Sequence, residues 1–162
     1  MYEKSFWEGK VFENTLKKKL NGHAGVDRDG IDIVCDIKID AKAMGSLLRG
    51  YPKNENYRWV EIQNVGGQPG SLCKKADYMA FETKDYTIYV AREVLLQFVL
   101  KKLQEPRNKL HLDRQDIERA HIHRNVDSVC YRIYQRHGRK DQIVLVKMLD
   151  LCFLSDAITF KK

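Results

Sequence analysis

The chain has 162 residues, of which 43% are hydrophobic and 10% aromatic, and its formal net charge is +7. This length suits a single domain with a buried core, and the apolar content excludes a disordered chain. No apolar run approaches the roughly 20 residues that a membrane-spanning helix needs, so we expect no membrane partner. Trp7 is soon followed by Glu8 and Lys10, unlike the apolar run of a signal peptide. We therefore expect an intracellular protein, cytoplasmic or in the host cytoplasm if viral.

Positive charge is concentrated in the C-terminal third of the sequence. Residues 101–140 contain eleven Lys/Arg and five Asp/Glu, which accounts for six of the seven net charges. Such clustering is typical of proteins that contact polyanions, and it predicts a nucleic-acid partner. A solvated basic face is the alternative. We expect one domain over 1–162, with a basic C-terminal extension from about 104.

The N-terminal third predicts a helix followed by a strand. Over residues 5–21, Glu13 shares one helical face with Leu16 and Leu20, which places a carboxylate on the inward stripe. An inward acid requires a cation or hydrogen bonds, and a salt bridge with a basic side chain is one solution. β-Branched residues from Ile31 to Ile39 then predict a strand, with Asp32 near its start. Residues 40–56 are interpreted as a short helix and a loop.

The middle of the chain alternates strands with turn signals. Strands are predicted at 58–62, at 77–81 and at 86–91, and an amphipathic helix is predicted over 92–103, before Pro106. Further on, residues 128–136 and 142–148 resemble a hairpin with its turn at 137–141. A last short helix is predicted near Asp150.

Three acids occur in three separate elements: Glu13, Asp32 and Glu61. Carboxylates that converge repel each other unless they bind a hard cation such as Mg²⁺ or Mn²⁺. A metal held in this way can polarise a phosphodiester and activate water. Residues 61 and 63 point to the same face of a regular strand, so Gln63 could orient the attacking water or a phosphate oxygen.

The order Glu13, Asp32, then Glu61-Ile62-Gln63 resembles the PD-(D/E)XK superfamily of nucleases. The resemblance spans roughly residues 9–103, and Gln63 stands where lysine is usual. It implies an α/β restriction-endonuclease-like core, with a mixed central sheet flanked by helices. It also implies a divalent-metal-dependent endonuclease acting on DNA, with Mg²⁺ or Mn²⁺ bound by Asp32, Glu61 and the Ile62 carbonyl. Glu13 would be an outer or second-metal ligand.

Several acids compete for these roles. Asp29 lies in a turn signal, and Asp77 at a strand start is more often a cap than a ligand. Asp36-Ile37-Lys38 is a literal D-x-K, but it follows Asp32 by only four residues, too few for two strands. We therefore rank it below Glu61-Ile62-Gln63. Ile31 occupies the position of the motif's proline.

The C-terminal hairpin offers the candidate contacts to the nucleic-acid backbone, namely Arg132, Arg136, Arg139 and Lys140. A homodimer would allow two strands to be cut. Two alternatives stay open. One is a non-catalytic nucleic-acid-binding protein on the same fold, with Gln63 as the mark of lost activity. The other is an interaction factor whose basic face meets an acidic protein.

Overall fold

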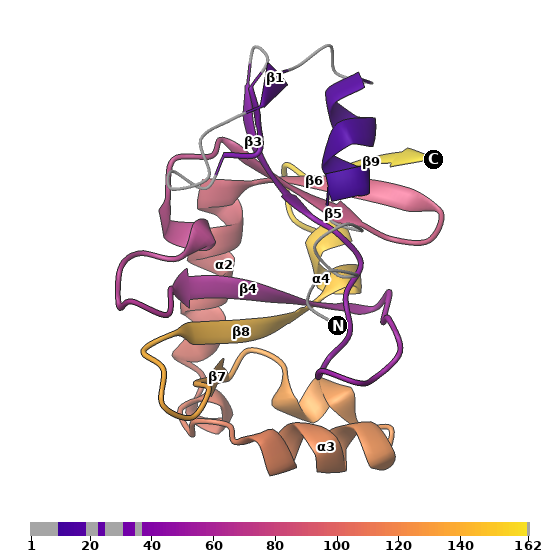
Figure 1. Cartoon of the computed structure of the whole chain (residues 1–162). Helices are drawn as coiled ribbons and strands as arrows, with labels where there is room; N and C mark the ends of the chain where they lie inside the picture. Colours follow the sequence, from indigo (N-terminus) through magenta and orange to yellow (C-terminus); the bar gives the residue numbers. More distant parts are fainter. Residues whose placement is uncertain (1–9, 19–22, 25–30, 35–36, 162) are drawn as a thin grey trace.

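The computed structural model describes residues 10–18, 23–24, 31–34 and 37–161, which form a mixed α/β fold with two sheets (Figure 1). The larger sheet has the order β1-β2-β3-β5-β6-β9, and the smaller has the order β4-β8-β7. The strands are β1 (His23–Ala24), β2 (Ile33–Val34), β3 (Lys38–Lys42), β4 (Tyr57–Gln63), β5 (Tyr78–Glu82), β6 (Tyr86–Ala91), β7 (Ile133–Tyr134), β8 (Gln142–Lys147) and β9 (Ile158–Lys161). The helices are residues 10–18, α2 (Arg92–Leu103), α3 (Arg114–Ile122) and α4 (Met148–Cys152), with 3₁₀ turns η2 (Ser71–Cys73), η3 (Pro106–Asn108) and η4 (Val126–Val129).

The larger sheet is mixed, because β3 and β5 are parallel whereas its other neighbours are antiparallel. In the β3–β5 register, Asp40 lies opposite Met79 and Lys42 opposite Phe81. Met79 and Phe81 are fully buried in the main core. Since residues two apart share a face of a strand, Asp40 and Lys42 point toward that core.

The opposite face of the larger sheet is covered by the helix at residues 10–18. Phe12 and Leu16 pack there against Ile33, Ile39 and Ala80. The sheet is thus buried on both faces, as expected of a sheet with a parallel pair at its centre. The N-terminal helix is confirmed over residues 10–18, and the rest of the predicted span lies outside the described residues.

The smaller sheet belongs to the main core together with α2, which runs behind β4 and β8 in the view of Figure 1. Val60, Leu95 and Val144 are almost fully buried in this cluster. The C-terminal third is part of both sheets, because β8 pairs with β4 and β9 pairs with β6. Residues beyond 104 therefore complete the fold.

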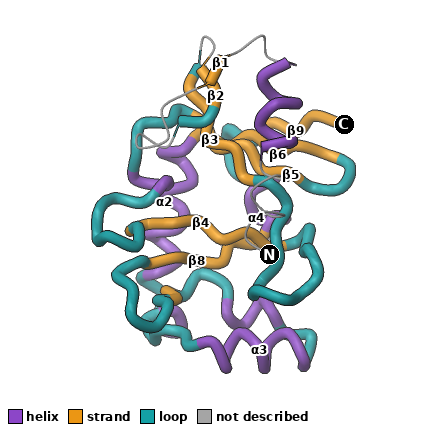
Figure 2. Tube along the Cα trace, viewed as in Figure 1, coloured by secondary structure: helices purple, strands orange, loops and turns teal. Residues whose placement is uncertain are grey.

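The strands at 58–62, 77–81 and 86–91 and the helix at 92–103 are confirmed within a residue or so. The single strand predicted from Ile31 to Ile39 is wrong, because β2 pairs antiparallel with β3. The short helix predicted after Asp40 is also wrong. Residues 40–42 extend β3 along β5, and residues 43–56 form the long loop from β3 to β4 (Figure 2).

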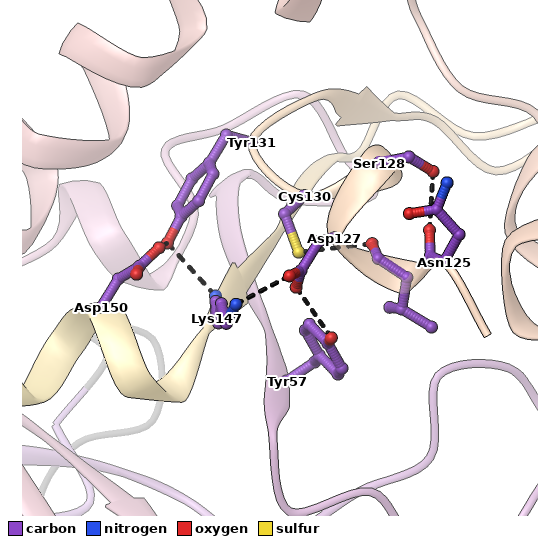
Figure 3. Close-up of polar contacts among 9 residues, drawn as sticks. Tyr57, Asn125, Asp127, Ser128, Cys130, Tyr131, Lys147 and Asp150 are labelled. Atoms are coloured by element: carbon purple, nitrogen blue, oxygen red, sulfur yellow. Dashed lines mark hydrogen bonds and ion pairs between the residues drawn. The ribbon is translucent and has the colours of Figure 1, made fainter.

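A polar network fixes η4 and α4 against the smaller sheet (Figure 3). The Tyr57 hydroxyl donates to Asp127 Oδ1 at 2.8 Å, and Lys147 Nζ lies 2.7 Å from Asp127 Oδ2. The Tyr131 hydroxyl donates to Asp150 Oδ2 at 2.5 Å. Tyr131 has a φ of +59°, which is rare for a bulky residue, and this network holds it there.

The 3₁₀ turn before Tyr131 explains why the C-terminal hairpin is shorter than predicted. Residues 126–129 form a 3₁₀ turn, so the strand predicted at 128–136 is reduced to β7, paired antiparallel with β8. The strand predicted at 142–148 is confirmed as β8, and the last short helix as α4.

Candidate active site

Two carboxylates and a lysine meet at β3. Asp40 Oδ1 lies 2.9 Å from Lys42 Nζ, and the Asp40 side chain is 4% exposed against 27% for Lys42. Just before β2, Asp32 Oδ2 accepts a hydrogen bond of 2.6 Å from the Ala41 N–H. Asp32 therefore sits beside the Asp40-Ala41-Lys42 segment.

The backbone of β3 also faces this position. The Ile39 carbonyl accepts a hydrogen bond of 2.8 Å from the Asp32 N–H, so Ile39 presents its polar groups to the β2 side. Ala41, two residues on, presents its N–H to the same side. Because the N–H and C=O of one strand residue point to the same edge, the Ala41 carbonyl faces that edge as well. The Ala41 carbonyl therefore points to the edge of β3 at which the Asp32 carboxylate is bound.

The electrostatics of the group follow from its burial. Burial, together with the negative charge of Asp40, raises the pKa of Asp32 to about 6, although the Ala41 N–H and the Lys42 ammonium act in the opposite sense. Burial also acts to lower the pKa of Lys42, but the carboxylates of Asp40, Asp32 and Glu61 outweigh it and leave that pKa above its usual range. Lys42 is consequently a cation at neutral pH.

One oxygen of this group has no donor. Asp40 Oδ2 is buried, and it accepts no hydrogen bond from the described residues. A buried acceptor without a partner costs about 1–3 kcal/mol, and such atoms in native structures call for an explanation such as an ion or water. Adjacent carboxylates, one with a raised pKa, are typical of metal-binding and acid–base sites.

Glu61 approaches the group from the smaller sheet, since its charge contributes to the raised pKa of Lys42. The loop after β4 passes close to Glu61 at Gly70, where only a glycine fits. A Cβ at Gly70 would lie 2.6 Å from the Glu61 carbonyl carbon and 2.7 Å from Glu61 Cγ. The Ile62 carbonyl, expected as a metal ligand, accepts a hydrogen bond of 2.7 Å from the Gly70 N–H.

The Gln63 side chain bonds the backbone of the loop before β8. The register between β4 and β8 shifts between Glu61 and Gln63, and such a bulge interrupts the regular alternation of side chains. Gln63 Nε2 donates to the Lys140 carbonyl at 2.7 Å. The amide thus ties β4 to the loop before β8.

The N-terminal carboxylate has a local partner. Glu13 Oε2 lies 2.8 Å from Lys10 Nζ, which is the salt bridge considered as the alternative to a ligand. Across the part of the chain that the structure describes, no three His, Cys, Asp or Glu side chains group so as to hold a metal ion. Glu13 thus pairs with Lys10, and the carboxylates that lie close together are those of Asp32 and Asp40.

The basic residues of the C-terminal hairpin have different environments. Arg136 pairs with the fully buried Asp141, and Arg132 Nε donates to the Leu110 carbonyl at 3.0 Å. The guanidinium of Arg139 has no partner within the described residues. The Lys140 side chain packs next to Gly67, its Cδ lying 3.2 Å from where a Cβ would be.

Sequence reasoning missed Asp40-Ala41-Lys42. This segment is itself a D-x-K, eight residues after Asp32, and that spacing leaves room for the β2–β3 hairpin. The D-x-K motif is visible in the sequence, but the alanines at 41 and 43 favour a helix there rather than a strand. Of the competitors, Asp77 accepts a hydrogen bond of 2.8 Å from the Lys38 N–H, a structural role. Asp29 and Asp36 lie outside the described residues.

In comparisons with known proteins, no family model, no curated protein and no solved structure matches the chain. In the ranges that the structure describes, no helix is long and apolar enough to cross a membrane. A function is therefore inferred from the grouping of Asp32, Asp40 and Lys42 itself.

Proposed function

We propose that the protein is a divalent-metal-dependent nuclease that hydrolyses phosphodiester bonds in DNA, with Asp32, Asp40 and Lys42 at its centre. The observation that supports this most is the meeting of the Asp32 carboxylate with the Asp40–Lys42 pair at one edge of β3. The resemblance to the PD-(D/E)XK nucleases then runs through Asp40-Ala41-Lys42, which supplies the lysine that Glu61-Ile62-Gln63 lacks. A restriction-endonuclease-like core is part of the same proposal.

The donor set suits Mg²⁺ or Mn²⁺. Both ions prefer oxygen ligands, and the edge offers two carboxylates together with the Ala41 carbonyl. Asp40 Oδ2, buried without a hydrogen-bond donor among the described residues, is an acceptor for which a cation would compensate. Asp32, Asp40 and the Ala41 carbonyl are thus the atoms that would hold the ion.

Each side chain has a distinct part in hydrolysis. A bound divalent ion polarises the phosphodiester and activates water. Asp32 is fixed by its hydrogen bond from the Ala41 N–H, so its carboxylate is pre-positioned. Lys42, kept cationic by the surrounding carboxylates, stabilises negative charge that develops on the phosphate oxygens. Glu61, on the other sheet, adds negative charge that helps to keep Lys42 protonated.

Cleavage of supercoiled plasmid with Mg²⁺ or Mn²⁺ tests the proposal. Asp40→Asn and Lys42→Gln should each reduce the rate at least about a hundredfold, in line with loss of a charge at a reacting centre. Asp85→Asn, in the exposed turn between β5 and β6, is the charge-matched control and should cut like wild type. Thermal unfolding of each variant separates loss of chemistry from loss of fold.

Two outcomes contradict the proposal. A wild-type protein that binds DNA or RNA but cuts no form of either would favour a non-catalytic binding protein. A folded Asp40→Asn variant that cuts like wild type would remove Asp40 from the centre. If Glu61→Gln and Gln63→Ala then abolish cleavage, the metal site lies on β4, with Asp32, Glu61 and the Ile62 carbonyl as ligands.

A further inference from the structure

A groove of about 790 Å³ lies between the loop after β3, the start of α3 and the loop from β7 to β8. Its volume falls within the range of ligand-binding sites. Trp59 and Tyr134 line it, and four arginines contribute to its wall, namely Arg49, Arg114, Arg136 and Arg139. α3 and β7 occupy the lower part of the molecule in Figure 1, away from the β2–β3 hairpin.

The cations of the groove are positioned for an anion. Arg136 is held by the fully buried Asp141, yet its side chain remains 40% exposed. A guanidinium has five N–H donors, so those not directed at Asp141 remain available. Arg114, whose side chain is 59% exposed, bonds Glu118 through Nε, and its other guanidinium nitrogens have no bond to a described residue. Among the described residues that line the groove, Asp113 is the one acid, and its carboxylate is occupied by the capping box of α3.

The aromatic side chains provide a stacking surface. The Trp59 and Tyr134 rings lie with centroids 5.5 Å apart at 36°. Trp59 Nε1 donates to the Leu47 carbonyl at 2.8 Å, which fixes the orientation of the indole. Aromatic rings beside arginines are the arrangement that binds unpaired bases and their phosphates, because every base has a face that can stack.

A second pocket lies beside the groove. This smaller pocket of about 190 Å³ is lined by Lys42 and Arg58, and it shares Ser46 and Trp59 with the groove. Arg58 is 4% exposed, and its Nε is buried without a partner among the described residues. Its terminal nitrogens donate to the carbonyls of Asn54, Tyr57 and Glu82, so Arg58 is a structural residue beside Lys42.

We propose that this groove binds single-stranded nucleic acid, with bases stacked against Trp59 and Tyr134 and phosphates on the arginines. A duplex offers no base face for stacking on such a surface, since its base faces are stacked within the helix. Binding in the groove stands on these residues alone. Only the further idea that the bound nucleic acid is the substrate of the cleavage centre rests on the proposed function.

Fluorescence anisotropy in EDTA measures this binding without cleavage. The probes are a fluorescein-labelled oligothymidylate of about 12 nucleotides, which matches the span of known single-strand sites, and a blunt duplex of equal length. Wild type should bind the single strand at least about tenfold more tightly than the duplex.

The arginine test is the double variant Arg114→Gln/Arg139→Gln. It should weaken single-strand binding about 10- to 100-fold and reduce the slope of log affinity against log salt by about one to two. The matched control is Arg107→Gln, since the Arg107 side chain is 73% exposed and does not line the groove. It should bind within about threefold of wild type. Equal loss in both variants would overturn the proposal.

The stacking test compares Tyr134→Leu, which keeps apolar bulk, with Tyr134→Phe, which keeps the ring. The leucine variant should lose about 5- to 50-fold in single-strand affinity, as expected for loss of one stacked base, and the phenylalanine variant should retain it. Equal affinities for single strand and duplex, with no effect of Tyr134→Leu, would overturn the proposal. So would absence of binding at low salt, which would favour an acidic protein partner.

These results are independent of the nuclease proposal. If the protein never cleaves nucleic acid but its variants bind as predicted, single-strand binding in the groove is supported and the nuclease proposal is wrong. If cleavage depends on Asp40 and Lys42 but all groove variants bind single strands as wild type does, the nuclease proposal is supported. The groove proposal is then wrong.

Discussion

The carboxyl group of Asp32 destabilises the folded state at neutral pH. Its folded-state pKa of about 6 lies above the value of 3.8 for an unperturbed aspartate, so the folded protein binds more protons than the unfolded chain between about pH 4 and 6. Stability attributable to this group is therefore present below about pH 4 and is lost as the pH rises through 6. We expect Asp32→Asn to raise the free energy of unfolding at pH 7 by about 1–3 kcal/mol.

Urea unfolding at several pH values measures this effect. The amide introduced by Asp32→Asn keeps an acceptor for the Ala41 N–H and has no charge to repel Asp40. The stability gained by this substitution should be near zero at pH 4 and grow toward pH 7. Asp85→Asn, at an exposed turn, should change stability by less than about 0.5 kcal/mol throughout. A loss of stability in Asp32→Asn at pH 7 would show that the carboxylate is a structural partner.

The same pKa predicts a proton released on metal binding. At pH 6, about half of the Asp32 carboxyls are protonated, and a divalent ion binds the carboxylate form. Titration calorimetry with Mn²⁺ in two buffers of different ionisation enthalpy should therefore report about half a proton released per ion. The number should fall toward zero at pH 8. Release that is unchanged between pH 6 and 8 would exclude Asp32 as the ligand.

At the scale of elements, Gly70 sets the position of β4 against η2. A Cβ there would meet the carbonyl carbon of Glu61 at 2.6 Å, and backbone cannot move aside as a flexible side chain can. We expect Gly70→Ala to destabilise the fold by about 1–3 kcal/mol, as overpacking does. Gly66→Ala, where the nearest atom lies 3.5 Å away on the Asn64 side chain, is the control and should change stability little in urea unfolding. Similar stabilities for the two variants would contradict this contact.

The elements that were predicted well from the sequence are those whose own residues show a clear periodicity. β4, β5, β6 and α2 combine alternation or helical periodicity with clear turn residues, so local pattern and tertiary packing agree. α3 was missed because its outward face is polar and only Ile117 and Ala120 are buried along it. β9 was missed because all four of its residues are exposed, which leaves no alternation to detect.

The candidate group was visible in the sequence only in part. Asp32 stood out because it is an acid next to an apolar β-branched stretch, and its role as a metal ligand stays a prediction. Asp40 and Lys42 were overlooked because the neighbouring Ala41 and Ala43 suggested a helix, whereas pairing of β3 with both β2 and β5 fixes a strand. Tertiary pairing overrides weak local propensity of this kind.

Across the whole molecule, the two sheets supply different parts of the proposed chemistry. The larger sheet supplies Asp40 and Lys42, with Asp32 directly before its strand β2, and the smaller sheet supplies Glu61 and Trp59. The basic charge of residues 101–140 is partly neutralised by local pairs, which include Lys102–Glu105 and Arg114–Glu118. The charge that matters for a polyanion is therefore the portion lining the groove, and net charge alone could not have located it.

The position of a bound ion tests the central claim most directly. A crystal soaked in Mn²⁺ and measured at the manganese absorption edge locates the ion by its anomalous scattering. We predict one peak enclosed by the carboxylates of Asp32 and Asp40 and the Ala41 carbonyl, lost in Asp40→Asn. A peak beside Glu61 and the Ile62 carbonyl instead, or none in crystals of a protein that cleaves DNA with Mn²⁺, would contradict the account.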